Sequence, residues 1–110
     1  MNRIGFEEMQ AMQQELRAKY REQWGELSPA RGRELLLWAM AEGGEVADII
    51  KKEGDAAIMT DPATRAHFAE EVCDVLMYLT DLLICYSITP QELSEAYVKK
   101  HRFNMQRSKT

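Results

Sequence analysis

The sequence predicts an all-α fold of four helices in one domain. Three prolines each follow a residue that commonly precedes the first turn of a helix. These pairs are Ser28-Pro29, Asp61-Pro62 and Thr89-Pro90. Between them the apolar residues recur at helical spacing, and no stretch shows the alternation of a strand. The length of 110 residues fits a single domain over residues 1–110.

The first helix is predicted at about residues 3–23. Its apolar residues follow the helical repeat, and charged and amide side chains fill the opposite face. The apolar positions are Met9, Met12, Leu16 and Tyr20. Gly25, directly after Trp24, suits the end of this helix.

The other three helices are predicted at about residues 28–53, 61–87 and 89–107. Gly54 suits the end of the second helix, and residues 54–60 form a short connection with room for a partial turn. Glu92 stands three residues after Thr89, which is the spacing of a capping box. Short connections favour antiparallel neighbours.

The two central helices are apolar on almost every face. A chain this short has only two other helices to cover those faces. The third helix carries a second apolar stripe beside its main one. The stripe is Val72, Leu76, Leu79 and Leu83. We therefore expect a homo-oligomer in which the central helices pack across the subunit interface.

Two acidic pairs interrupt the apolar faces of the central helices. Glu42 and Glu45 share one face of the second helix, and Glu71 and Asp74 share one face of the third. The first pair lies on an arc that should be buried. The apolar members of that arc are Leu35, Trp38, Val46 and Ile49. Four carboxylates thus stand where core residues are expected.

Facing carboxylates of this kind need neutralisation. At about 6 Å each like-charged pair costs roughly 2–3 kcal/mol at an effective dielectric constant of about 20. Neither run offers a basic residue on the acidic arc, which leaves shared protons or a divalent cation. Hard cations such as Mg²⁺ prefer oxygen ligands, and Mg²⁺ is typically held by carboxylates together with substrate phosphates.

Net charge, hydropathy and cysteine content limit the classes of function that fit this sequence. A net charge of −4 gives no reason to expect a nucleic-acid partner. No apolar run reaches the roughly 18 residues of a membrane span. Cys73 and Cys85 would lie about 18 Å apart on one helix and cannot form a disulfide. We expect a cytoplasmic protein that binds no membrane.

The last helix continues its apolar spacing into three polar residues, Lys100, Asn104 and Arg107. Near a metal-bound phosphate such groups are effective hydrogen-bond donors. The alternative is that they complement the helix dipole and solvate its last turns. The pattern alone does not separate the two.

The two acidic pairs, 25 residues apart, followed by the three polar residues of the last helix, resemble the MazG-like all-α nucleotide pyrophosphohydrolases. The resemblance covers residues 28–107. It implies a four-helix MazG-like bundle that forms a homodimer or homotetramer. It also implies Mg²⁺-dependent cleavage of a nucleoside triphosphate to the monophosphate and pyrophosphate, with Mn²⁺ as the alternative metal. The physiological role it implies is clean-up of the nucleotide pool.

The resemblance also assigns roles to residues. Glu42, Glu45, Glu71 and Asp74 would be the catalytic metal ligands, and Lys100, Asn104 and Arg107 would contact phosphate or sugar. Tyr78 matches a position that some relatives use against the nucleotide. Ala41 departs from the pattern, since many relatives have a further glutamate there. Glu70 and Asp48 are the nearby carboxylates that could substitute for that glutamate.

Aromatic side chains offer the base a surface to stack on. Trp24, Trp38 and Tyr78 are the candidates, although aromatic residues at helical spacing more often belong to a core. A different class of function also fits part of the pattern, namely a non-catalytic helical adaptor that oligomerises through its apolar faces. The adaptor explains the second stripe of the third helix and leaves the four carboxylates unexplained.

Overall fold

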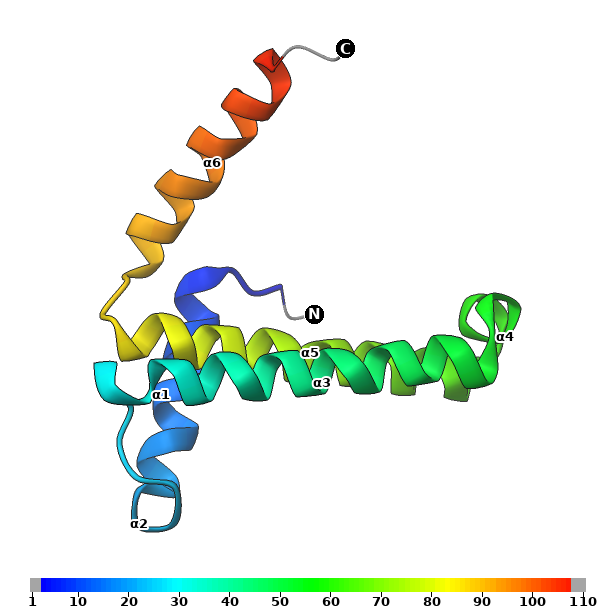
Figure 1. Cartoon of the computed structure of the whole chain (residues 1–110), viewed down its shortest axis with the longest axis horizontal. Helices are drawn as coiled ribbons and strands as arrows, with labels where there is room; N and C mark the ends of the chain where they lie inside the picture. The colour runs from blue at the N-terminus through cyan, green and yellow to red at the C-terminus, as the bar shows by residue number, and fades with distance from the viewer. Residues whose placement is uncertain (1–2, 108–110) are drawn as a thin grey trace.

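The computed structural model describes residues 3–107, and all regular structure within them is helical (Figure 1). Four long helices carry the fold, and two shorter ones and a 3₁₀ turn connect them. The elements are α1 (Phe6–Lys19), α2 (Arg21–Trp24), η1 (Pro29–Arg31), α3 (Gly32–Glu53), α4 (Asp55–Thr60), α5 (Pro62–Cys85) and α6 (Pro90–Gln106). The predicted all-α class with four long helices is confirmed.

The centre of the molecule is the antiparallel pair of α3 and α5, which lie side by side along their length (Figure 1). Gly54 ends α3 with a φ of 86°, a conformation that favours glycine. At the start of α5, Asp61 accepts hydrogen bonds from the backbone N–H of Thr64 at 3.0 Å and from its hydroxyl at 2.7 Å. These two signals fix where α3 ends and where α5 begins.

Helix α1 crosses the end of the pair where α3 begins and α5 ends (Figure 1). Among residues 3–107 the buried apolar residues are few, namely Leu35, Ala39, Ile49 and Cys85. Gln10 and Gln13 of α1 are buried with them, and each donates a hydrogen bond, Gln10 to the carbonyl of Ile88 at 2.8 Å and Gln13 to Asp81 at 2.9 Å. Hydrogen bonds therefore join α1 to α5 and to the connection that follows it.

Helix α6 leaves the central pair at an angle of 112° to α5 and extends away from it (Figure 1). Its start is fixed by the predicted capping box, in which Thr89 and Glu92 exchange hydrogen bonds of 3.0 Å. Within the described residues α6 packs only on α1, where the rings of Phe6 and Tyr97 lie 6.1 Å apart. The described chain by itself therefore does not close into a four-helix bundle.

Many large apolar side chains of this structure face solvent, on α3, α5 and α6. They include Leu36, Leu37, Met40, Leu76, Leu79, Tyr97, Phe103 and Met105. The radius of gyration is 16.5 Å, against about 13 Å for a compact domain of this length. No single described helix is long and apolar enough to span a membrane; only the bent combination of α5 and α6 meets that criterion.

Three boundaries differ from the prediction. The first helix breaks at Tyr20 into α1 and α2, so Trp24 ends a short helix. The connection at residues 54–60 is largely helical, as α4. Ser28 makes no side-chain capping bond, and Pro29 opens a 3₁₀ turn before α3 begins at Gly32. A turn thus interrupts the helix expected at residues 3–23 and delays the start of the next one, whereas the connection at residues 54–60 contains more helix than expected.

Candidate functional site

The acidic pairs of α3 and α5 come together across the groove between the two helices. One carboxylate oxygen from each of Glu42, Glu45 and Glu71 lies within 4.8 Å of the others. Asp74, one helical turn from Glu71, adjoins Glu42. The structure therefore brings together the four carboxylates that the sequence singled out, and we call them the acidic cluster.

The electrostatics of the acidic cluster are unfavourable without a cation. Partial burial raises the pKa of Glu42 above its ordinary value, and the neighbouring carboxylates, first Glu45 and then Asp74 and Glu71, raise it further. None of the four is in a salt bridge with a lysine, arginine or histidine of residues 3–107. The cluster is also more exposed than the sequence suggested: Glu45 faces solvent and the other three are half-buried.

Next to the acidic cluster, toward the start of α5, lies a hollow of about 420 Å³. Glu45, Glu71, Lys52 and His67 contribute to its wall. His67 Nδ1 lies 3.8 Å from Glu70 Oε1, and these two side chains and Glu71 form a second group of ligand atoms within 4.8 Å. Both carboxylates named as substitutes for the one absent at Ala41 thus lie near the cluster, since Glu70 adjoins Glu71 and Asp48 lines the same hollow.

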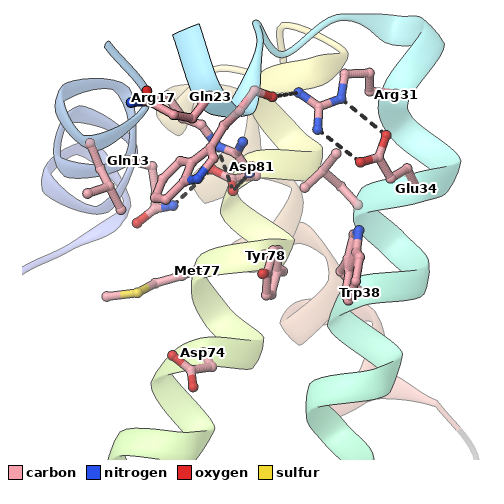
Figure 2. A pocket seen from close by; sticks show the side chains of 13 residues that line it. Gln13, Arg17, Gln23, Arg31, Glu34, Trp38, Asp74, Met77, Tyr78 and Asp81 are labelled. Atoms are coloured by element: carbon pink, nitrogen blue, oxygen red, sulfur yellow. Dashed lines mark hydrogen bonds and ion pairs between the residues drawn. The ribbon is translucent and has the colours of Figure 1, made fainter. Parts of the chain in front are cut away.

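A pocket of about 500 Å³ lies on the other side of the cluster, between α1, α2, α3 and α5 (Figure 2). Asp74 belongs both to this pocket and to the acidic cluster. The lining residues that Figure 2 labels are Gln13, Arg17, Gln23, Arg31, Glu34, Trp38, Asp74, Met77, Tyr78 and Asp81. Asp74, Tyr78 and Asp81 follow one another by single turns of α5, so the pocket runs along that helix away from the cluster.

Aromatic side chains form the middle of the pocket. Trp38 of α3 and Tyr78 of α5 face each other, with ring centroids 6.3 Å apart and planes 20° apart (Figure 2). Burial raises the pKa of Tyr78, and the charge of Glu42 adds to the effect. Trp24 also lines the pocket; its ring stacks on Tyr20 at 4.6 Å and covers the guanidinium of Arg17 at 5.3 Å.

The inner end of the pocket is polar and its charges are paired. Asp81 accepts hydrogen bonds from Gln13 at 2.9 Å and from Arg17 at 2.7 Å and 3.3 Å. Arg31 binds Glu34 through two hydrogen bonds, at 2.9 Å and 3.2 Å (Figure 2). Each arginine of the pocket therefore has a carboxylate partner, so this end suits an uncharged ligand group better than a phosphate.

The structure does not bring the polar residues of the last helix to this site. Lys100, Asn104 and Arg107 lie on or at the end of α6, which has no packing contact with α3 or α5. All three are exposed, and the ammonium of Lys100 lies 5.1 Å from the ring of Phe103. Within one chain these three residues therefore lie apart from the acidic cluster and from the pocket.

Comparison with known proteins leaves the family open. Neither protein-family models, nor curated proteins, nor solved structures give a match to this chain. The MazG-like resemblance therefore depends on the motif residues of the sequence alone.

The sequence interpretation missed the residues of the polar end, namely Gln13, Arg17 and Asp81. A signal for one of them was present, because Asp81 is a lone acid inside the apolar run of residues 75–85. Gln13 and Arg17, four residues apart on α1, share a helix face with Tyr20. Only the crossing of α1 over α5 shows that these three side chains meet.

Proposed function

We propose that this protein is a Mg²⁺-dependent nucleoside triphosphate pyrophosphohydrolase, which converts a ribo- or deoxyribonucleoside triphosphate into the monophosphate and pyrophosphate. One observation carries the proposal: Asp74 connects a cluster of four carboxylates to an aromatic pocket. A ligand that fits both parts has a flat apolar group at one end and a polyanion at the other, which describes a nucleotide. Removal of non-canonical or surplus nucleotides is a role consistent with such an activity.

The acidic cluster fits a hard divalent cation. Its donors are all carboxylate oxygens, three of them within 4.8 Å, and mutual repulsion already raises the pKa of Glu42. Mn²⁺, which accepts the same ligands, is the alternative to Mg²⁺. When bound, such an ion polarises a phosphoryl oxygen, lowers the pKa of a coordinated water and stabilises pyrophosphate as it leaves.

The side chains of the chain supply positioning and proton transfer. Trp38 and Tyr78 hold the base by stacking, which directs the phosphates toward Asp74 and the rest of the cluster. Glu42 adjoins Glu45, Glu71 and Asp74, so it is placed either to hold the metal with them or to accept a proton from the attacking water. Glu45 and Glu71, which face the opposite hollow, are placed to hold the metal on the pyrophosphate side.

The proposal includes a homodimer or homotetramer. The accessible surface of one chain is 8643 Å², against about 6,200 Å² expected of a folded monomer of 12.7 kDa. The excess exceeds the roughly 800 Å² that each partner buries in a standard interface. In such an assembly Lys100, Asn104 and Arg107 of one copy contact the phosphates bound by another.

The exposed apolar side chains also favour a second function, a non-catalytic adaptor that oligomerises through α3, α5 and α6. An adaptor needs no divalent cation and turns over no nucleotide. A single assay of nucleotide hydrolysis therefore distinguishes the two functions.

The test is incubation of the purified protein with Mg²⁺ and each of the common ribo- and deoxyribonucleoside triphosphates, followed by detection of pyrophosphate. We expect release of pyrophosphate and the monophosphate, and loss of at least about a hundredfold in kcat for Glu45→Gln. Glu15→Gln, at an exposed position of α1, is the control and should behave as wild type. An inactive wild type, or an active Glu45→Gln variant, would refute the proposal and favour the adaptor.

A further inference from the structure

Trp24 borders the aromatic pocket from a segment that is not part of the central helix pair. Among the described elements, α2 packs only on α1. Residues 25–28 after α2 have no regular structure, and Gly25 turns the chain with a φ of 72°. The indole is 42% exposed, and it lines the same pocket as Trp38 and Tyr78. The position of this pocket wall therefore depends on what holds the backbone of Trp24.

Arg31 holds that backbone. Its Nη1 atom donates one hydrogen bond to the carbonyl oxygen of Trp24 at 2.8 Å and another to the carbonyl oxygen of Glu26 at 3.2 Å. Arg31 is the residue directly before α3, so the two bonds connect the chain after α2 to the start of α3. A single guanidinium thereby fixes the turn that follows Trp24.

Glu34 fixes the guanidinium in turn. Its carboxylate accepts hydrogen bonds from Nη2 of Arg31 at 2.9 Å and from Nε at 3.2 Å (Figure 2). This two-bond pairing constrains the plane of the guanidinium, which a lysine ammonium would not reproduce. We call the contacts from Glu34 through Arg31 to Trp24 the arginine bridge. The bridge joins α3, which carries Trp38, to the segment that carries Trp24.

The ring of Trp24 is held by α1. Tyr20 stacks on it with ring centroids 4.6 Å apart, and the guanidinium of Arg17 lies 5.3 Å from its centroid. Arg17 is itself paired with the buried Asp81 of α5 at 2.7 Å. Helix α1 thus holds the ring and the arginine bridge holds the backbone. A wall that is fixed before the ligand arrives lowers the entropic cost of binding.

We propose, on the basis of the proposed function, that Arg31 is a positioning residue for nucleotide binding. Through the carbonyl of Trp24 it keeps the indole against the base, and Glu34 keeps Arg31 in place. Trp24 does not line the hollow on the metal side of the acidic cluster, so its contact with the base is the same before and during phosphoryl transfer. The bridge therefore contributes to the affinity for substrate and not to the rate of the chemical step.

The kinetics of Arg31→Met test the proposal. The variant removes every hydrogen bond of the bridge, so KM for the nucleoside triphosphate should rise at least about fivefold while kcat changes less than about twofold. Arg21→Met is the matched control, because Arg21 is exposed, pairs with Glu26 of the same segment at 2.9 Å and does not line this pocket. An unchanged KM in a folded Arg31→Met enzyme would overturn the inference and leave the proposed function standing.

A double variant shows whether Arg31 acts through Trp24 or touches the ligand itself, since Arg31 also lines the pocket. Trp24→Ala should raise KM, and adding Arg31→Met should raise it no further, because residues that act through one contact are not additive. Independent increases would overturn the positioning role. Melting temperatures show whether the variants fold. If Arg31→Met does not fold, Glu34→Gln replaces it in both measurements and should raise KM at least about twofold.

Fluorescence tests the bridge without catalysis. The chain has two tryptophans, so Trp38→Phe leaves Trp24 as the only one. Adding Arg31→Met should raise the quenching constant for acrylamide about twofold, and an unchanged constant would refute the bridge. If the wild type hydrolyses no triphosphate, the proposed function fails, and titration of the Trp38→Phe protein with dUMP, dCMP, dAMP and dGMP decides the inference. Quenching of Trp24 by at least one of them, weakened by Arg31→Met, supports it, and no quenching by any of them refutes it.

Discussion

Glu42 shows how one carboxylate connects the electrostatics of the site to its stability. In the unfolded chain its pKa is near the ordinary value of 4.5, and in the folded protein burial and Glu45 raise it. The folded state therefore disfavours the charged form of Glu42. The sign follows from this: the stability present below the ordinary pKa is lost as the pH rises through the raised value.

Glu42→Gln should consequently raise the melting temperature of the metal-free protein by a few degrees at pH 7, because it removes a repelled charge. At pH 3.5 the wild-type side chain is protonated and the difference should vanish. Thermal melts in the presence of a chelator measure both values. Added Mg²⁺ should stabilise the wild type more than the variant, and above the dissociation constant the stabilisation should rise with the logarithm of the Mg²⁺ concentration. A variant less stable than wild type at pH 7 without metal would contradict the repulsion argument.

At the scale of the element, α3 carries two consecutive glycines inside a helix. Gly43 and Gly44 stand between Glu42 and Glu45, and each costs roughly 1 kcal/mol relative to alanine in a helix interior. A Cβ atom added at either position would meet no other atom within 4 Å in the single chain. By contrast, a Cβ at Gly32, where α3 begins, would overlap the ring of Tyr86. Packing within the chain thus explains Gly32 and does not explain Gly43 or Gly44.

We expect Gly44→Ala to stabilise the isolated chain by up to about 1 kcal/mol, since the space is open and alanine favours the helix. Urea denaturation at low protein concentration, where association is weakest, measures this. Gly32→Ala serves as the opposite control and should destabilise. A destabilised Gly44→Ala variant would show that a second copy or another helix approaches α3 at this point.

At the scale of the whole molecule, α6 stands apart from the groove between α3 and α5. The carboxylates lie on α3 and α5 and the cations on α6, so a single chain does not join them. The exposed apolar surface of the same helices supplies the driving force for association. If the proposed oligomer forms, each site combines side chains of two subunits.

Mixing two inactive variants tests this composition. Glu45→Gln lacks a metal ligand and Lys100→Ala lacks a phosphate contact, and each alone should be impaired. A mixed oligomer contains a site with Glu45 from one subunit and Lys100 from the other, so co-refolding the two should restore part of the activity. Light scattering verifies that oligomers form. Three results would show that α6 has only a structural role. They are a monomeric wild type, a fully active Lys100→Ala variant and a mixture that recovers no activity.

The sequence alone determined the helical class, the starts of α5 and α6 and the four carboxylates of the acidic cluster. Proline after a capping residue and glycine at positive φ act within a few residues, so Asp61, Thr89 and Gly54 can be interpreted without tertiary structure. The cluster was predictable because carboxylates on an apolar face violate the helical pattern, and the violation occurs twice.

The tertiary structure alone decided the pocket and the position of α6. Gln13, Arg17 and Asp81 meet through contacts 64 or more residues apart, which no local spacing encodes. Lys100 and Asn104 had the right chemistry for phosphate, but the direction of α6 depends on the turn at residues 86–89 and on what α6 packs against. Local propensity determines where a helix begins and ends. Which helices pack together depends on which apolar faces become buried, and that is decided only when the chain folds.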